Sequence, residues 1–408
     1  ESPLETAPTA RVPAPSALTA VEPTRPAPPR EETGVPEEDV IRSAEQLRAL
    51  IAHHASTGGG DLRLGSGVDL ELATVDLPPG SWTIAAAPGD HRTRPRLRFH
   101  PSPFSSSSTW SALFNLQSGE LKLRGVDLIV EDFDRQSMGR LATFALAAGS
   151  TLDLTDCTVS LVGQATSPTV AAVVPRRGGN EAAEDGDPPR PVVVRIRDAF
   201  LRTVGDAFAA ASNQRLDCRL ENVVVAADGS LLHAQGGTAP TRDAPALTLQ
   251  LDRVLARAKG GLVHLEGSID ETELPLTQVD ARNTIVSTGG DGSSPLFRVD
   301  GRGRTRDLAD RIRWTGENVG YHEIAVYRVD DGGQTGVPPQ RYSRSEWLNN
   351  FVARDESAVV DVDFLDHDAP VRSAKSLSPK NLRLSPRSSS TREGPDFNAV
   401  PTPPDADS

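Results

Sequence analysis

The stretch Leu296-Phe297-Arg298-Val299-Asp300-Gly301 returns along the chain with small changes. If Phe297 is taken as the marker of this phrase, its equivalents fall at positions 84, 114, 144, 170, 208, 232, 263, 297 and 327. The spacing is about thirty residues, a period at which structural units stack because one unit alone cannot bury its apolar face. The repeat therefore predicts a stacked array, and this prediction decides the fold class.

Apolar and polar residues alternate within each repeat. The run Leu249-Gln250-Leu251-Asp252-Arg253-Val254 shows the form that follows most markers: alternation, then two polar residues where the chain should bend. Alternation predicts strands with one buried face. Like phrases recur in one direction, without the two-residue turns of hairpins, which indicates parallel strands joined by right-handed crossovers. We predict an all-β protein: a single-stranded right-handed parallel β-helix solenoid with a short N-terminal capping helix and a short C-terminal helix.

A β-propeller is the alternative repeat architecture. Its blades run to about forty residues or more and carry aromatic signatures, whereas aromatic residues make up only 4% of this chain. The 34 glycines and 33 prolines indicate many turns and favour an all-β fold over a helical bundle.

Charge and cysteine content exclude several classes of protein. The 43 basic and 56 acidic residues give a net charge of −13 with no block of Lys or Arg, which argues against a nucleic-acid partner. Cys157 and Cys218 are too few for a disulfide scaffold, and both occupy inward positions of predicted strands, as small buried hydrophobes do. No apolar run is long enough to predict a membrane span.

Composition divides the chain into five expected segments. Ser43 and Gln46 have the spacing of a capping box at the start of the first helix. Because the chain opens on Glu1, we expect a piece of a larger protein that is tethered to a preceding N-terminal region. The expected segments are a disordered Pro/Ala-rich linker at 1–38, a capping helix and turn at 39–61, the β-helix at 62–335 with a loop insertion at 175–191, a C-terminal cap at 336–369 and a disordered tail at 370–408.

The run Trp82-Thr83-Ile84-Ala85-Ala86-Ala87-Pro88-Gly89, followed by Arg94-Pro95-Arg96-Leu97-Arg98-Phe99, resembles the opening coils of pectate-lyase-like right-handed parallel β-helix proteins. Similar arrays occur beyond Pro-rich linkers in large planctomycete-type bacterial proteins, including membrane-anchored Ser/Thr kinases. The resemblance implies an extracytoplasmic β-helix. It does not fix the function, because this fold hosts lyases, hydrolases, esterases, adhesins and spacers.

The catalytic motifs of the family are largely missing. Its lyases hold Ca²⁺ with clustered carboxylates and use an Arg as base, and its hydrolases use several Asp residues with Gly-His-Gly and Arg-x-Lys motifs. The phrase Val204-Gly205-Asp206-Ala207-Phe208 resembles the hydrolase Gly-Asp-Asp motif, but its second Asp is absent and Gly-His-Gly does not occur. A glycosidase needs two carboxylates at one bond. Since Asp206 has no evident partner, we interpret it as a turn residue and assign no catalytic residue.

Outward side chains should form columns, because parallel strands stack about 4.8 Å apart. One column is predicted to run through Ala85, Asn115, Ala145, Ala171, Ala209, His233, His264, Arg298 and Arg328. Its C-terminal half and the neighbouring column supply the candidate binding residues His233, Gln235, His264, Glu266, Arg298, Asp300, Arg328 and Asp330. These residues form either a sugar- or anion-binding patch or simply cross-strand ion pairs on a solvated sheet. The two histidines lack a third ligand, so we expect no metal and no cofactor.

Three functions remain open from the sequence. The first is a non-catalytic extracytoplasmic ligand-binding, sensor or spacer module of a larger bacterial protein, with carbohydrate or another protein as its partner. The second is a polysaccharide lyase or glycoside hydrolase with a site that the sequence does not reveal. The third is a purely structural, adhesin-like module.

Overall fold

The computed structural model describes most of the chain after residue 39. The expected linker at 1–38 and residues 175–189 of the expected loop insertion lie outside the described residues. The described ranges are 40–88, 93–101, 110–132, 140–163, 168–172, 190–211, 214–236, 246–267, 274–289, 294–301, 309–332, 337–357, 362–386 and 394–404.

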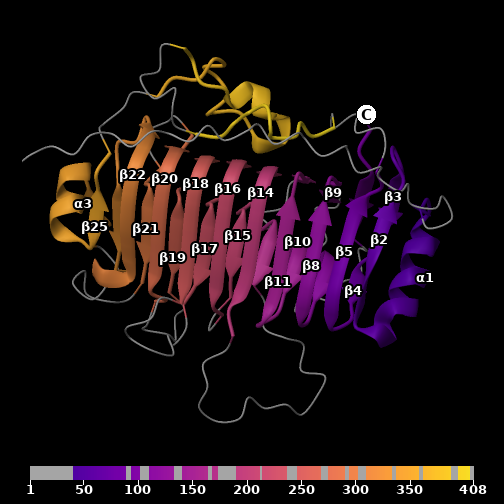
Figure 1. Cartoon of the computed structure of the whole chain (residues 1–408). Helices are drawn as coiled ribbons and strands as arrows, with labels where there is room; N and C mark the ends of the chain where they lie inside the picture. Colours follow the sequence, from indigo (N-terminus) through magenta and orange to yellow (C-terminus); the bar gives the residue numbers. More distant parts are fainter. Residues whose placement is uncertain are drawn as a thin grey trace, which may run out of the picture. The chain divides into compact units, whose positions relative to one another are not determined.

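Strands dominate the described residues, and they form two long sheets (Figure 1). The main path of the 15-stranded sheet runs through β1 (Val40–Ile41), β2 (Gly59–Leu64), β5 (Gly80–Ala86), β8 (Gly119–Arg124), β11 (Ser150–Thr155), β14 (Val192–Thr203), β16 (Leu216–Ala227), β18 (Leu247–Ala258), β20 (Thr277–Ser287), β22 (Ile312–His322) and β25 (Ala353–Asp355). Beside this path lie β3 (Asp69–Leu72), β6 (Arg96–Phe99), β9 (Asp127–Asp132) and β12 (Thr158–Gly163).

The second sheet has ten strands, and their order across the sheet follows their order in the chain. In spatial order these strands are β4 (Val75–Leu77), β7 (Trp110–Leu116), β10 (Arg140–Leu146), β13 (Val170–Ala172), β15 (Phe208–Ala210), β17 (Leu232–Gln235), β19 (Val263–Glu266), β21 (Phe297–Asp300), β23 (Arg328–Asp331) and β24 (Gln340–Tyr342). The strands pair in parallel throughout, except that β24 is antiparallel to β23.

The thirty-residue repeat sets the register of the ten-stranded sheet. Phe114 pairs with Phe144, and their rings stack with centroids 5.9 Å apart. The same register continues through the markers at 170, 208, 232, 263 and 297. The prediction of parallel pairing between like positions is therefore confirmed over this span.

The markers at the two ends of the array were placed wrongly. Ile84 lies in β5 of the other sheet, where it pairs with Leu123, and Val75 takes the place beside Phe114. At the far end, Phe297 pairs with Arg328 rather than with Tyr327. At the first marker the repeat pattern assigned a strand to the wrong sheet. At the last marker the register shifts by one residue, where Tyr327 stacks on Trp347 of the C-terminal helix.

A column of residues with left-handed backbone conformation bends the chain in the 15-stranded sheet. Each member lies at the predicted two-residue step where the chain bends, either within a strand or, for Gly125 and Asp156, between two strands. Asn222 Nδ2 donates to Asp198 Oδ1 at 2.6 Å, and Asn318 Nδ2 donates to Asn283 Oδ1 at 3.3 Å. Gly, Asn and Asp adopt this conformation at the least cost. The column consists of Gly125, Asp156, Asp198, Asn222, Arg253, Asn283 and Asn318, with φ between 49° and 67°.

Two helices cover the ends of the stack of strands (Figure 1). The helix α1 (Ala44–His54) has the predicted capping box of Ser43 and Gln46, and it buries Leu47 and Ile51 next to β2. The helix α3 (Arg344–Asn350) buries Trp347 against Phe297 at a ring distance of 5.2 Å. No helix in the described part of the chain has the length and apolar character that a membrane crossing requires.

The C-terminal segment packs on the 15-stranded sheet, which differs from the expectation of a disordered tail. We call residues 362–386 and 394–404 the C-terminal strap; it includes the short 3₁₀ helices η4 (Ala374–Ser376) and η5 (Pro379–Leu382). The strap forms a second apolar cluster with strand residues that face away from the main core. The cluster contains Phe200, Val224, Ala226, Leu255 and Ile285 of the sheet, and Val362, Phe364, Ala369, Ala374, Leu377, Leu382 and Val400 of the strap.

The composition of the strap did not predict its packing, but the sequence of the strands beneath it indicated a second buried face. The run Val223-Val224-Val225-Ala226-Ala227 is apolar at every position, as in strands that are buried on both faces. The strap itself is rich in Ser, Pro and charge, which is typical of disorder. Its few apolar residues suffice because a preformed apolar surface receives them.

Two buried arginines bind the strap through its backbone. Arg257, with no exposed surface, donates from Nε to the carbonyl oxygen of Pro370 at 3.0 Å and from Nη1 to Asp228 Oδ1 at 2.9 Å. Arg202 donates to the carbonyl oxygens of Leu377 at 3.4 Å and Pro404 at 3.2 Å. Since an irregular segment leaves carbonyl groups without backbone partners, the fork of guanidinium donors satisfies them.

We expect Arg253→Asn to raise the free energy of unfolding by about 1 kcal/mol, because Arg is strained in the left-handed conformation that Asn tolerates. The lost ion pair with Glu221, at 3.2 Å, is exposed and offsets little of this gain. Urea titration measures the change. The matched control is Arg282→Asn, which replaces an exposed Arg one position before the bend of the next strand and should stay within about 0.5 kcal/mol of wild type. A destabilised Arg253→Asn variant would contradict the strain argument.

We expect Arg257→Met to cost about 3 kcal/mol, because it removes the cation from a buried pair and leaves strap carbonyls without donors. Amide hydrogen exchange should accelerate over residues 362–386 and remain slow in β7 and β10. Arg219→Met, at an exposed position of β16, is the control and should leave exchange unchanged. Equal protection of the strap in both variants would show that the arginine does not hold it.

Candidate functional site

Six of the eight predicted binding residues lie on the outer face of the ten-stranded sheet. Strands β17, β19 and β21 bring His233, His264 and Arg298 side by side, and Gln235, Glu266 and Asp300 form the adjacent column. Asp206, in the turn before β15, joins them through its contact with His233. We call Asp206, His233, Gln235, His264, Glu266, Arg298 and Asp300 the polar ladder.

His233 is held between two carboxylates. Its Nδ1 lies 3.0 Å from Asp206 Oδ2, and its Nε2 lies 3.1 Å from Glu266 Oε2. The ring stacks on that of His264 with centroids 4.6 Å apart and an interplanar angle of 6°. This stacking follows from the parallel register, because equivalent residues on adjacent strands are separated by one strand spacing.

Asp300 joins the second histidine to the arginine. His264 Nε2 lies 2.9 Å from Asp300 Oδ2, and Arg298 Nε donates to the same oxygen at 2.8 Å. Burial alone would raise the pKa of Asp300, but the hydrogen bond from His264 and the charge of Arg298 outweigh it and lower that pKa below its ordinary value. Asp300 therefore stays ionised and orients both neighbours.

The ladder combines fixed and accessible groups. The side chains of Glu266 and Arg298 are 49% and 48% exposed, whereas those of His233 and His264 are 22% and 20% exposed. The histidines and Asp300 thus form a rigid floor, from which one carboxylate and one guanidinium reach solvent. Hydroxyl groups of a ligand could accept from Arg298 and donate to Glu266 without rearrangement of the floor.

The assignment of Arg328 and Asp330 to this face was wrong. In β23 they pair with Phe297 and Val299, which point inward, so Arg328 is 0% and Asp330 3% exposed. Arg328 Nε donates to Asp330 Oδ1 at 2.7 Å, and its guanidinium lies 3.9 Å from the ring centroid of Phe351. A one-residue shift of register in β23 turns Arg328 and Asp330 inward. With this shift, Tyr327 stacks on Trp347 of the C-terminal helix with ring centroids 5.6 Å apart.

Asp206 was interpreted from the sequence as a turn residue without a partner. The structure gives it two: His233 and the backbone N–H of Ser230, which donates to Asp206 Oδ1 at 2.7 Å. Asp206 lies in a turn, where no alternation predicts the direction of a side chain. The available signal was the thirty-residue repeat, which places the turn before Phe208 against the turn before Leu232.

The described residues contain no group of three or more His, Cys, Asp or Glu side chains arranged to hold a metal ion. Cys157 and Cys218 are free, buried thiols. A scan of the chain against protein-family models gives no match, and neither does a search among curated proteins.

The stability that His233 provides should depend on pH. Burial lowers its pKa, but the hydrogen bonds and charges of Asp206 and Glu266 outweigh burial and raise that pKa above its ordinary value. The stabilisation is then complete below the unfolded-state pKa of about 6.5 and is lost as pH rises through the folded-state pKa. We expect His233→Gln to lose more unfolding free energy at pH 6 than at pH 9. Gln235→Ala, a non-titrating neighbour, should give equal losses at both pH values; equal losses for His233→Gln would refute the linkage.

Proposed function

We propose that the two sheets are faces of a single-stranded right-handed parallel β-helix of the pectate-lyase-like kind. The order of the strands supports this: β16 belongs to the 15-stranded sheet, β17 to the ten-stranded sheet, and this alternation continues through β23. Each strand pairs in parallel with its equivalent one repeat later. Right-handed winding is the hand that parallel crossovers adopt.

On this scaffold the polar ladder is a non-catalytic carbohydrate-binding surface. The observation that carries the proposal is the combination of half-exposed Glu266 and Arg298 with a floor already fixed by hydrogen bonds. A sugar presents neighbouring hydroxyl groups that both donate and accept, which suits a carboxylate beside a guanidinium. Preorganisation limits the side-chain entropy lost on binding.

We place this binding module in the extracytoplasmic part of a larger bacterial protein. The argument is the resemblance of the opening coils and the Pro-rich composition of residues 1–38. A sensor in that position needs a surface that recognises a partner, and neither a sensor nor a spacer needs a reactive centre.

Hydrolysis of a polysaccharide is the second candidate, because Asp206 and Glu266 are two carboxylates close together. Glycosidases keep such a pair facing one bond with room for substrate or water between them. Here the imidazole of His233 occupies the space between the two carboxylates and hydrogen-bonds to both. Binding is therefore favoured over turnover.

An array of immobilised plant, algal and bacterial polysaccharides tests the proposal with the full chain. We expect binding to at least one polymer, and we expect Arg298→Ala and Glu266→Gln each to weaken it about tenfold or more, which corresponds to about 1.4 kcal/mol. The control is Arg282→Ala. This variant removes an exposed Arg that pairs with Glu317 on the 15-stranded sheet, and it should bind like wild type.

The same polymers are assayed for release of reducing ends or unsaturated products. None should appear. Product that is lost in Asp206→Asn would establish the enzyme instead, and silence in both assays would favour a purely structural module.

A further inference from the structure

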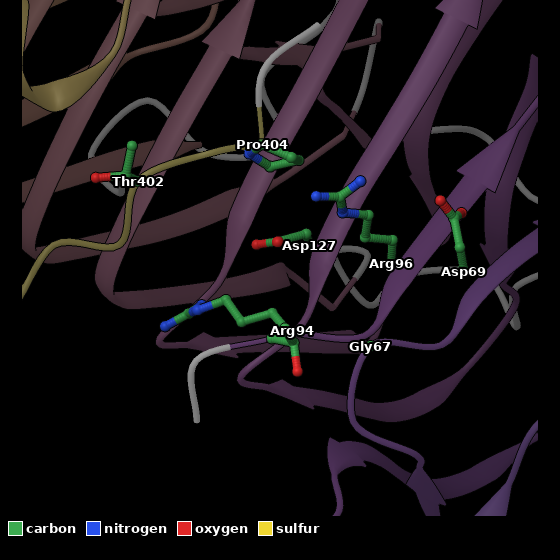
Figure 2. A pocket seen from close by; sticks show the side chains of 8 residues that line it. Gly67, Asp69, Arg94, Arg96, Asp127, Thr402 and Pro404 are labelled. Carbon is green, nitrogen blue, oxygen red and sulfur yellow. The ribbon is translucent and has the colours of Figure 1, made fainter. Parts of the chain in front are cut away.

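A pocket of about 410 Å³ lies on the 15-stranded sheet, away from the polar ladder (Figure 2). Its floor is made by three residues in direct register: Asp69 of β3, Arg96 of β6 and Asp127 of β9. Thr93 and Arg94 come from the segment before β6, and Thr402 and Pro404 come from the C-terminal strap. A cavity of this size suits a small molecule.

Two of the charged groups of the pocket are already neutralised by protein partners. Asp69 accepts from Arg98 Nε at 3.0 Å, and Arg94 donates to the carbonyl oxygen of Asp156 at 2.5 Å as well as pairing with its carboxylate. The guanidinium of Arg96 makes neither a hydrogen bond nor an ion pair with any residue of the described chain, so its donors are available to a ligand.

The carboxyl of Asp127 is the neighbour of Arg96 in the pocket. Asp127 is 4% exposed, and its Oδ1 accepts from Thr158 Oγ1 at 2.8 Å. Burial raises the pKa of this carboxyl, and the negative charge of Asp156 acts in the same direction, against the bond from Thr158 and the charges of Arg94 and Arg96. Asp69, which also lines the pocket on β3, is paired with Arg98 and so adds little net negative charge.

We propose that this pocket binds a small hydroxylated carboxylate through Arg96. The guanidinium of Arg96 offers parallel N–H groups to the two carboxylate oxygens, the geometry in which such pairs are strongest. Asp69 and Thr402 are further polar residues of the pocket lining that hydroxyl groups of the ligand can contact. An ionised Asp127 would repel the incoming anion, and a protonated Asp127 would donate a hydrogen bond to it. Binding therefore takes up a proton at Asp127 and strengthens as pH falls.

Calorimetric titration of the full chain with gluconate and with sorbitol tests the proposal. The two probes share a six-carbon polyol chain and differ in whether one end is a carboxylate. We expect gluconate to bind at least about tenfold more tightly than sorbitol, and Arg96→Gln to weaken gluconate binding about tenfold or more. Wild-type affinity should rise as the pH falls, because the pKa of Asp127 is raised, and Asp127→Asn should abolish that rise.

Two controls keep the result interpretable. Arg282→Ala, which removes an exposed Arg of β20 outside both the pocket and the polar ladder, should leave gluconate binding unchanged. If Arg96→Gln does not fold, Arg96→Lys keeps the charge without the fork and should still weaken binding. Absence of gluconate binding, equal affinity for sorbitol, or full affinity in the Arg96 variant would each overturn the proposal.

Discussion

Parallel pairing of like positions is the constraint on which the rest of the structure depends. Because β15, β17, β19 and β21 pair in step, each side chain meets its equivalent about one strand spacing away. Inward equivalents such as Phe208, Leu232 and Val263 become a continuous core. Outward equivalents become rows of interacting polar groups by the same rule. The stacked histidines and the carboxylates that flank them are thus a product of the register, and a slip of one residue turns such groups inward, as it does for Arg328 and Asp330.

The same constraint produces the face that the strap covers. The left-handed bends at Asn222 and its equivalents keep the strand ends in register, so Arg202, Ala226, Arg257 and Ser287 follow one another across four strands. Small Ala226 between the two arginines leaves their guanidinium groups room to reach the strap carbonyls. Two charged side chains without partners would cost free energy on an apolar face. Here both donate hydrogen bonds to backbone carbonyl groups of the irregular strap that covers them.

The sequence predicts the interior of this protein better than its boundaries. Period-two alternation together with a thirty-residue repeat places Phe114, Phe144, Val170, Phe208 and Phe297 correctly, because each has paired neighbours on both sides. The last parallel strand, β23, departs from the pattern; its neighbour is the antiparallel β24 rather than another repeat, and it contacts Phe351, while the preceding Tyr327 contacts Trp347. The contacts of Asp206 and the pocket around Arg96 were not predicted from the sequence. They form where a turn or the strap contacts the strands, and the period of the repeat carries no information about such contacts.

The buried arginine anchors also imply an order of events during synthesis. The strap acceptors of Arg202 and Arg257 lie more than a hundred residues downstream in the chain, at Pro370, Leu377 and Pro404. Until residues 362–404 have been synthesised, the apolar outer face of β14 to β20 stays exposed to solvent, and the guanidinium groups lack their strap acceptors. The strap therefore docks after the strands beneath it have been made, and a nascent chain that stalls before this point exposes an apolar surface on which it can aggregate.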